Sequence, residues 1–212
     1  MTNNDAALDL LVRAVIVGDT PTASRLIAAS PAIVSRHVER GATREHATEH
    51  IHNEINHYIY GGDTALHAAA AGYRVSLVQV LITAGADVSA KNRRGAEPLH
   101  YAADGQPGSH TWQPDEQAAT ITVLIAAGAD PNAADKSGVT PLHRAVRCRC
   151  GAAVEALLAG GADARQMNRN GSTPMNLATR TTGRGGSGSA EAKVQQGLII
   201  RLLQSHDAQP EN

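Results

Sequence analysis

The feature that most constrains this chain is a helix-start signature that recurs at a fixed distance along the sequence. Copies beginning at Thr64 and Glu97 lie 33 residues apart, and copies beginning at Thr140 and Thr173 show the same spacing. Most copies open with a sequence similar to Thr-Pro-Leu-His and end in Gly-Ala-Asp. Each carries two short apolar stripes that neither helix can bury alone, so the copies must stack on one another.

The clearest copy, residues 134–163, shows why each unit is a pair of helices. Thr140 is a good N-cap, and Pro141 suits the first helical position because its missing N–H would be unpaired there anyway. A second apolar stripe follows Gly151 and stops at Gly160, which is typical of a helix end. The pattern therefore predicts helix, tight turn and helix within each period.

A period of 33 with this opening and closing resembles the ankyrin repeat. The resemblance covers about residues 61 to 208 and implies an all-α solenoid of stacked helix pairs with β-turn tips. It places four repeats at 61–90, 91–133, 134–165 and 166–208. The rich use of Ala, Arg and Gly is typical of a GC-rich bacterial source.

Two stretches before the first full repeat depart from the signature. Residues 5–30 predict a helix pair without it, and we interpret them as an atypical N-terminal cap, because terminal repeats must present a polar outer surface. Residues 42–60 interrupt the array, and their apolar residues cluster on one side of a helical wheel. We expect an inserted helix there, and a single solenoid domain over residues 1–212.

Three histidines, His46, His50 and His57, share the other side of that expected helix. His46 and His50 would lie about 6 Å apart along the axis, with His57 about 10 Å further on. One helix then offers at most two imidazoles to one ion, whereas a catalytic zinc needs three protein ligands. We interpret the face as solvent-exposed, since a metal would need a further ligand from elsewhere, and we predict no metal or cofactor.

Two repeats are longer than the period, because loops 104–117 and 181–190 are inserted between their helices. The first loop contains Trp112, the only Trp of the chain, which either binds a ligand or covers the end of the helical stack. The second loop is rich in Gly and Ser and contains Arg184, so it is either an anion cradle or a flexible linker.

Basic residues are concentrated around these loops. From residue 134 to residue 184 there are eight Lys or Arg and three Asp or Glu, an excess of five positive charges in a chain whose net charge is −1. A phosphate- or carboxylate-bearing ligand is one hypothesis for this edge. The residues proposed to bind it are Tyr101, Asp104, Trp112, Arg147, Arg180 and Arg184.

The ankyrin resemblance implies a different function, a scaffold that binds another protein through its concave face and turn tips. The candidate partner-binding residues on the tips are Asn92, Arg93, Arg94, Lys136, Arg169 and Asn170. These residues are equally compatible with a plain solubilising surface. The alternative function is a binder of a small anionic ligand, or an enzyme, that uses the two long loops.

The histidines of the repeated signature, His67, His100 and His143, recur once per repeat and should form a column. In the ankyrin family this histidine is a structural hydrogen-bonding residue, and the resemblance implies the same role here. The fourth repeat carries Asn176 instead, which preserves a hydrogen bond but not imidazole chemistry.

Composition excludes several other classes. A net charge of −1 argues against nucleic acid as a partner, and the absence of a run of 18 apolar residues argues against a membrane protein. The first residues lack a cationic segment, so we expect no signal peptide and a cytoplasmic location.

Cys148 and Cys150 are too close in sequence for an unstrained disulfide and are expected to be reduced. No known catalytic motif is present, and a Cys148–His143 pair has the wrong helical spacing for catalysis.

Overall fold

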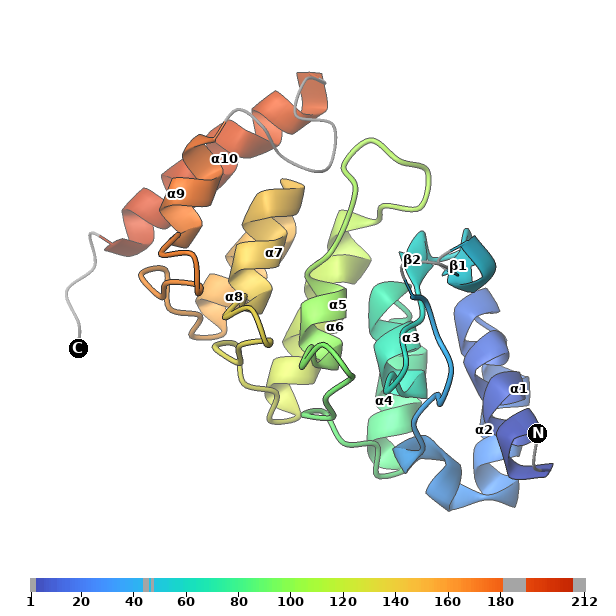
Figure 1. The fold of residues 1–212 in the computed structure, drawn as a ribbon. Coiled ribbons are helices and arrows are strands. Elements are labelled where there is room, and N and C mark those ends of the chain that lie inside the picture. The colour runs from blue at the N-terminus through green and yellow to red at the C-terminus, as the bar shows by residue number, and fades with distance from the viewer. Residues whose placement is uncertain (1–2, 44–45, 47, 181–189, 208–212) are drawn as a thin grey trace.

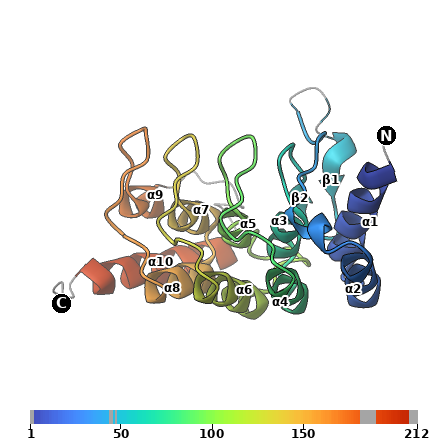
Figure 2. The same ribbon diagram turned by 90° about the horizontal axis from the view of Figure 1, so that it is seen from below.

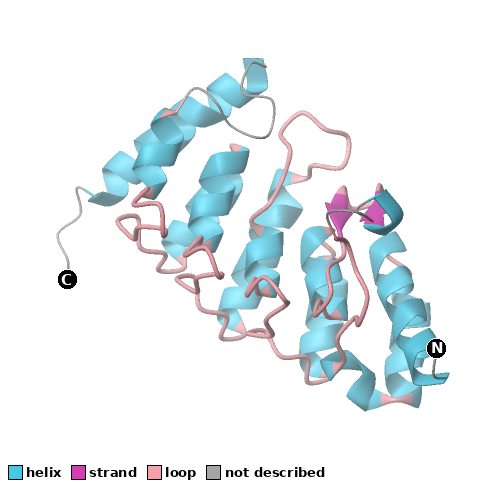
Figure 3. Ribbon diagram, viewed as in Figure 1, coloured by secondary structure: helices cyan, strands magenta, loops and turns pink. Residues whose placement is uncertain are grey.

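The computed structural model describes residues 3–43, 46, 48–180 and 190–207. Most regular structure in these residues is helical (Figures 1 and 3). In chain order the helices are α1 (Asn3–Val17), α2 (Thr20–Ala29), α3 (Ala65–Ala71), α4 (Val75–Thr83), α5 (Pro98–Ala102), α6 (Pro114–Ala126), α7 (Pro141–Cys148), α8 (Gly151–Ala159), α9 (Pro174–Thr179) and α10 (Ala190–Asp207). The described part also holds 3-10 helices at Pro31–Ser35 and Thr48–His50 and a two-stranded sheet of β1 (Ile51–His52) and β2 (His57–Tyr58).

The helices form two stacked rows. The odd-numbered helices make one row, called here the inner row, and the even-numbered helices make the other (Figure 2). Within the inner row α3 packs on α5 and α5 on α7, while α4 packs on α6 and α6 on α8 in the other row. Extended fingers project beside the inner row before α5, α7 and α9 (Figure 2). This arrangement confirms the expected all-α solenoid of helix pairs.

A column of apolar side chains runs through the inner row. Leu66, Leu99 and Leu142 are each the second residue of their helix, and each is fully buried. Met175 occupies the equivalent position in α9 but is only partly buried. These side chains therefore hold equivalent places in successive layers, as the 33-residue period predicts.

The signature histidines link each repeat to the next. Their Nδ1 atoms accept hydrogen bonds from the backbone N–H groups that cap their own helices, so the Nε2–H groups can donate to carbonyls of the following repeat. The Nε2–O distances are 3.1 Å for His67 to Ala96, 3.0 Å for His100 to Val139 and 2.9 Å for His143 to Ser172. The structural role implied by the ankyrin resemblance is confirmed.

Asn176 shows what remains when the imidazole is absent. Its side-chain oxygen accepts from the Thr173 N–H at 3.1 Å, as the histidines do within their own caps. A carboxamide lacks the second ring nitrogen that bonds to a following repeat. Asn176 thus preserves the cap of the last signature helix without the onward link.

The expected cap helices form at the N-terminus. α1 buries Leu8, Leu11, Val12 and Val15, the face that the sequence pattern indicated. α2 begins at Thr20, where the Asp19 carboxylate accepts from the Thr22 N–H at 3.0 Å. Arg74 ties this pair to the first full repeat, since its guanidinium donates to the Ile16 carbonyl at 3.2 Å.

The prediction of an inserted helix at 42–60 is wrong. The described part of this stretch holds one short 3-10 helix and an antiparallel hairpin that pairs Ile51 with Tyr58 and His52 with His57. Asn56 adopts a left-handed φ of 47° at the end of the connecting turn, which Asn tolerates and a continuing helix does not. Ile55 is still buried. The apolar pattern therefore predicted burial of this residue correctly but predicted the wrong secondary structure.

Arg149, one of the eight basic residues between positions 134 and 184, has a structural role. It ends α7 with a left-handed φ of 64°, and its side chain is fully buried. The guanidinium donates to the carbonyls of Ala178 at 2.8 Å and Arg180 at 2.5 Å. These bonds attach α7 to the end of α9, so Arg149 is not available to a ligand.

We expect Arg149→Ala to lower the free energy of unfolding by about 2–3 kcal/mol, because two charge-assisted bonds to buried carbonyls are lost. Urea denaturation followed by circular dichroism measures this change. Arg147→Ala is the matched control, since 38% of its side chain is exposed, and it should cost less than about 1 kcal/mol. Equal effects of the two substitutions would contradict the structural role.

Candidate binding cleft

A cleft of about 700 Å³ lies beside the inner row of helices. Its walls come from the ends of α3, α5 and α7, the β1–β2 hairpin, the loop that follows α5, and the inner sides of the fingers. Asn56 in the hairpin turn donates to Gln106 in the loop at 3.0 Å, so these two walls are joined. The cleft is thus built from segments far apart in the sequence.

All the aromatic residues of the chain line this one cleft. The sequence has four Tyr, one Trp and no Phe. The five that line the cleft are Tyr58, Tyr60, Tyr73, Tyr101 and Trp112. Tyr101 and Tyr73 are buried and belong to the core behind the cleft, whereas Tyr58, Tyr60 and Trp112 are partly exposed and form its aromatic surface.

Asp104 is the electrostatic centre of the cleft. Its carboxylate accepts from Arg144 at 2.7 Å and lies 3.5 Å from His57 Nε2 and 3.9 Å from Arg147. Arg144 also contacts Asp135 at 3.4 Å and so bridges the loop to a finger. Burial raises the pKa of the Asp104 carboxyl, but Arg144, His57 and Arg147 together hold that pKa well below its usual value.

The loop from Asp104 to Gln113 is held by its ends. The Tyr73 hydroxyl donates to the Asp104 carbonyl at 2.5 Å, and the buried Gln117 amide donates to the same oxygen at 3.2 Å. A side chain at Gly105 would meet Cys150 Sγ at 2.6 Å and Tyr73 Oη at 2.9 Å, so only Gly fits there. The loop is shorter than the predicted range 104–117, because the last four residues of that range begin α6 at Pro114.

Trp112 covers the helical stack, which is the structural alternative left open by the sequence. Its indole N–H donates to Gln117 at 3.0 Å and its ring packs against the core. It also lines the cleft while remaining partly exposed, so ligand binding by this side chain stays a prediction.

The other proposed ligand-binding residues divide into three groups. Tyr101, Asp104 and Arg147 line the cleft with Trp112. Arg180 is exposed and donates to Ser172 Oγ at 3.2 Å, and it is not part of the cleft wall. Arg184 and most of the expected loop 181–190 lie outside the described residues.

Sequence reasoning missed several residues of the cleft. Tyr58, Tyr60 and His57 reach it only because residues 51–58 form a hairpin, whereas a helix was expected. Arg144 was not among the proposed binding residues, and its two aspartate partners lie 40 and 9 residues away. The concentration of all Tyr residues between positions 58 and 101 was the one available signal.

The finger tips form a continuous edge beside the cleft. The backbone N–H of Arg93 donates to the Gly61 carbonyl in the loop before α3 at 3.0 Å, and those of Lys136 and Arg169 donate to carbonyls of the preceding finger at 3.0 and 3.1 Å. Of the candidate partner-binding residues, Arg93, Arg94, Lys136, Arg169 and Asn170 are exposed. The order of the tips is therefore fixed by the backbone, and two of these exposed side chains also bond to it: Lys136 Nζ donates to the Arg93 carbonyl at 2.8 Å, and the Arg93 guanidinium donates to the Ala42 carbonyl.

Asn92 is the exception among the tip candidates, because it is buried. Its amide donates to Asp63 at 2.8 Å and Tyr101 at 2.9 Å. Its side-chain oxygen accepts from the N–H groups of Arg94 at 2.8 Å and Ala96 at 3.1 Å. Asn92 therefore shapes its finger, and proposing it as a surface contact was wrong.

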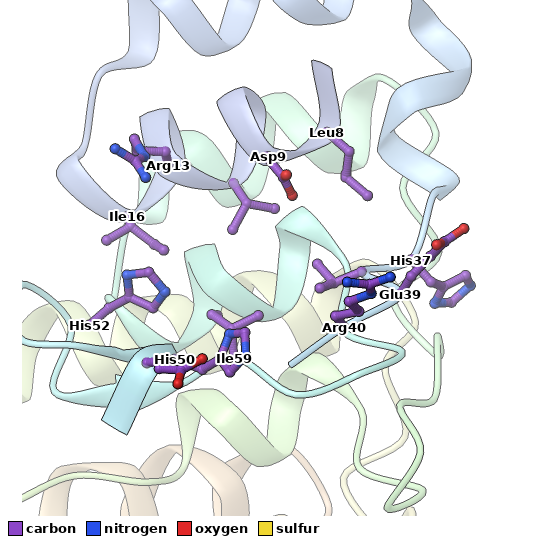
Figure 4. Close-up of a pocket in the computed structure, with 13 residues that line it drawn as sticks. Leu8, Asp9, Arg13, Ile16, His37, Glu39, Arg40, His50, His52 and Ile59 are labelled. Carbon is purple, nitrogen blue, oxygen red and sulfur yellow. The ribbon is translucent and has the colours of Figure 1, made fainter. Parts of the chain in front are cut away.

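A second pocket of about 410 Å³ lies between α1 and the hairpin region. Figure 4 shows its apolar side chains, among them Leu8, Ile16 and Ile59, together with three histidines, His37, His50 and His52. Burial lowers the pKa of His52. No aromatic Tyr or Trp lines it, so the composition of the first cleft is not a general property of the molecule's hollows.

The histidines considered for metal binding do not converge. His46 lies 3.4 Å from Glu49, whereas His57 contacts Asp104 in the large cleft and His50 lines the second pocket. Within the residues that the structure describes, no group of three or more His, Cys, Asp or Glu side chains is placed to hold a metal ion. The shared face on which the metal hypothesis rested does not exist.

The thiols are also unsuited to nucleophilic chemistry. Cys148 and Cys150 are both unpaired and buried. Burial, with the nearby Asp104 carboxylate, raises the pKa of the Cys148 thiol to about 11. A thiol with this pKa is protonated at neutral pH, so the Cys148–His143 pair has no activated nucleophile.

Stacked helix pairs, a hydrogen-bonded row of fingers and a cleft beside the inner helices define a helical repeat solenoid. A family model described as ankyrin repeats in three copies matches residues 11–110, and one described as ankyrin repeats in many copies matches residues 124–178. The chain therefore belongs to the ankyrin repeat family. No curated protein matches it. None of the described helices is both long and apolar enough to cross a membrane.

Proposed function

We propose that this protein is a binding scaffold that holds a segment of another protein in the aromatic cleft. Ankyrin repeats are generally protein–protein interaction modules. The observation that carries the proposal is the gathering of all five Tyr and Trp residues around one cleft that also contains Arg94, Arg144 and Arg147. Tyr, Trp and Arg are the residues that most often dominate binding energy at protein interfaces.

The rigidity of the cleft supports the same function. Tyr101 is buried and supports the cleft wall from behind: its hydroxyl donates to the Asp63 carboxylate at 2.8 Å, and its ring lies 4.3 Å from that of the partly exposed His57. Trp112 and Tyr73 are likewise fixed by hydrogen bonds. Side chains that are already ordered lose little conformational entropy when a partner binds, so more of the contact energy remains as affinity.

A small anionic ligand is the second candidate, and one observation favours it. Within the described residues the Nε donors of Arg144 and Arg147 are buried without an acceptor. A phosphate or carboxylate group could accept from such donors if the guanidinium groups shifted slightly. Calorimetric titration with inorganic phosphate, citrate and a nucleoside monophosphate tests this alternative, which requires saturable binding that Arg147→Ala weakens.

The proposed scaffold function is tested by selecting binders from an unbiased displayed peptide library and measuring their affinities for variants. We expect Tyr60→Ala and Arg94→Ala each to weaken the selected peptides about tenfold or more, since they remove cleft contacts without cutting a hydrogen bond of the fold. Arg201→Ala on α10 is the control, because this exposed side chain lies outside the cleft. Peptides that bind all three variants equally would contradict the proposal.

The two free cysteines also bear on location. Cys148 and Cys150 are kept unpaired in the buried interior, which suits a reducing compartment. This supports our proposal of a cytoplasmic location.

A further inference from the structure

We infer that the partner segment is acidic: the cleft and the finger tips beside it fit an extended peptide whose Asp or Glu side chains meet the exposed arginines and lysine. This inference rests on the proposed scaffold function and deepens it by naming the chemistry of the partner. It depends on which charges at the cleft are already neutralised and which are not.

The acidic side chains in the cleft wall are already paired with other groups of the protein. Asp104 and Asp135 are the two carboxylates that line it, and both contact Arg144, at 2.7 and 3.4 Å. The other oxygen of Asp135 accepts from the N–H groups of Ser137 and Val139 inside its own finger. Arg144 and these two aspartates therefore form a closed group that presents little negative charge to a ligand.

Arg147 and Arg94 remain available in the same wall. Arg147 is 38% exposed, and its closest carboxylate contact among the described residues is 3.9 Å from Asp104, which is already paired with Arg144. Arg94 lies with its guanidinium carbon 5.2 Å from the centre of the Tyr60 ring, and no carboxylate contacts it in the described part. A stacked guanidinium keeps its N–H edge free to bind a carboxylate.

The finger tips extend this positive charge. Arg93, Lys136 and Arg169 are exposed at successive tips, and the backbone ladder holds the three tips side by side. Asp135 is the only acid in the finger segments 91–96, 134–139 and 167–172, and it faces inward. A protein with a net charge of −1 thus carries a basic edge next to its one aromatic cleft.

A peptide fits these charges better than a nucleic acid does. A protein that makes about six to ten phosphate contacts gains a strong, salt-dependent affinity for nucleic acid. The five cations here, Arg93, Arg94, Lys136, Arg147 and Arg169, are fewer, and they adjoin apolar and aromatic surface. An acidic peptide with interspersed apolar residues matches both properties, because its carboxylates reach the cations while its apolar side chains contact the tyrosines.

The test is a titration of the whole protein with a fluorescein-labelled peptide of about twelve residues in which Glu alternates with Leu and Ala. Binding is measured by anisotropy and by the emission of Trp112, the only Trp, which lines the cleft. We expect saturable binding that weakens about tenfold or more when the salt concentration rises from about 50 to about 300 mM. The same peptide with Gln in place of Glu should bind at least about tenfold more weakly.

Charge reversal locates the binding site. Arg94→Glu and Arg147→Glu should each weaken the Glu peptide about tenfold or more, whereas Arg201→Glu on α10 should leave its affinity unchanged. Circular dichroism confirms that the variants fold. Equal binding of the Glu and Gln peptides, tighter binding of a Lys peptide, or no loss in either cleft variant would overturn the inference.

Two further outcomes separate this inference from the scaffold proposal. If the unbiased library instead yields apolar or basic peptides that require Tyr60, the scaffold function stands and the acidic partner is wrong. If a single-stranded oligonucleotide binds more tightly than the Glu peptide at the same salt concentration and depends on Arg94 and Arg147, the acidic-peptide inference is overturned in favour of a phosphate polymer.

Discussion

Leu142→Ala is expected to lower the free energy of unfolding by about 3–5 kcal/mol, the largest effect of any single substitution considered. Leu142 is fully buried in α7, whose layer lies between that of Leu99 in α5 and that of Met175 in α9. Truncation removes the transfer energy of the lost methyl and methylene groups and leaves a cavity that the layers above and below cannot close. Urea denaturation monitored by circular dichroism measures the loss.

Met175→Ala and Val194→Ala are the matched controls for this prediction. Met175 holds the equivalent place in α9 but is only partly buried, so its truncation should cost roughly half as much. Val194 is 64% exposed on α10, and its truncation should cost less than about 0.5 kcal/mol. Equal losses of unfolding free energy at the three sites would mean that the layers do not share a continuous core.

The second large effect is loss of stability on acidification, because the signature histidines must stay neutral. Burial, aided by the nearby Arg144, lowers the pKa of His100 to about 3, and burial also lowers the pKa of His67 and His143. The unfolded chain binds protons at these histidines below about pH 6.5, whereas the folded chain does not. Stability is therefore fully present above pH 6.5 and is lost as the pH falls from there toward the folded pKa.

For His100 alone, this linkage predicts a loss of about 2 kcal/mol between pH 7 and pH 5. His67 and His143 act in the same direction. The neutral form matters because Nδ1 accepts from the Glu97 N–H at 3.1 Å, and a protonated Nδ1 cannot accept. Urea denaturation at pH 7, 6 and 5 measures the dependence.

His100→Asn isolates this contribution, and the chain itself supplies the precedent in Asn176. The variant should be less stable at pH 7 by about 1–3 kcal/mol, since it loses the bond to the Val139 carbonyl and leaves unfilled volume. Its stability should then fall by about 2 kcal/mol less than that of the parent between pH 7 and pH 5. An unchanged pH dependence would show that the pKa of His100 is the same in the folded and unfolded chains.

The repeat itself was predictable in detail. Thr140 and Pro141 mark the start of α7 as expected, and Leu66, Leu99 and Leu142 occupy the equivalent buried positions that the period requires. The candidate site was predicted in part, since Tyr101, Asp104, Trp112 and Arg147 all line the cleft. These successes share a cause, because a loop inserted into a regular stack must sit beside the helices that flank it.

The failures share a cause as well. Residues 42–60 carry apolar residues at spacings that suit either a helix or a hairpin, and the pairing of Ile51 with Tyr58 decides between them. Asn92 looked like a surface residue of a turn, but it is buried by Asp63 and Tyr101 from other parts of the chain. In both cases the deciding contacts join residues that are distant in sequence or depend on a partner strand.

The sequence by itself determined the layers: caps, apolar stripes and terminating glycines act within a few residues, and repetition at 33 residues turns that local information into a solenoid. Only the tertiary structure decided the cleft. Its walls meet through the contact of Asp104 with Arg144 and the bond from Asn56 to Gln106, which join residues 40 and 50 positions apart. A sequence period does not predict such pairs. They can form and contribute stability only after folding of the stack has brought the hairpin, the loop and α7 together.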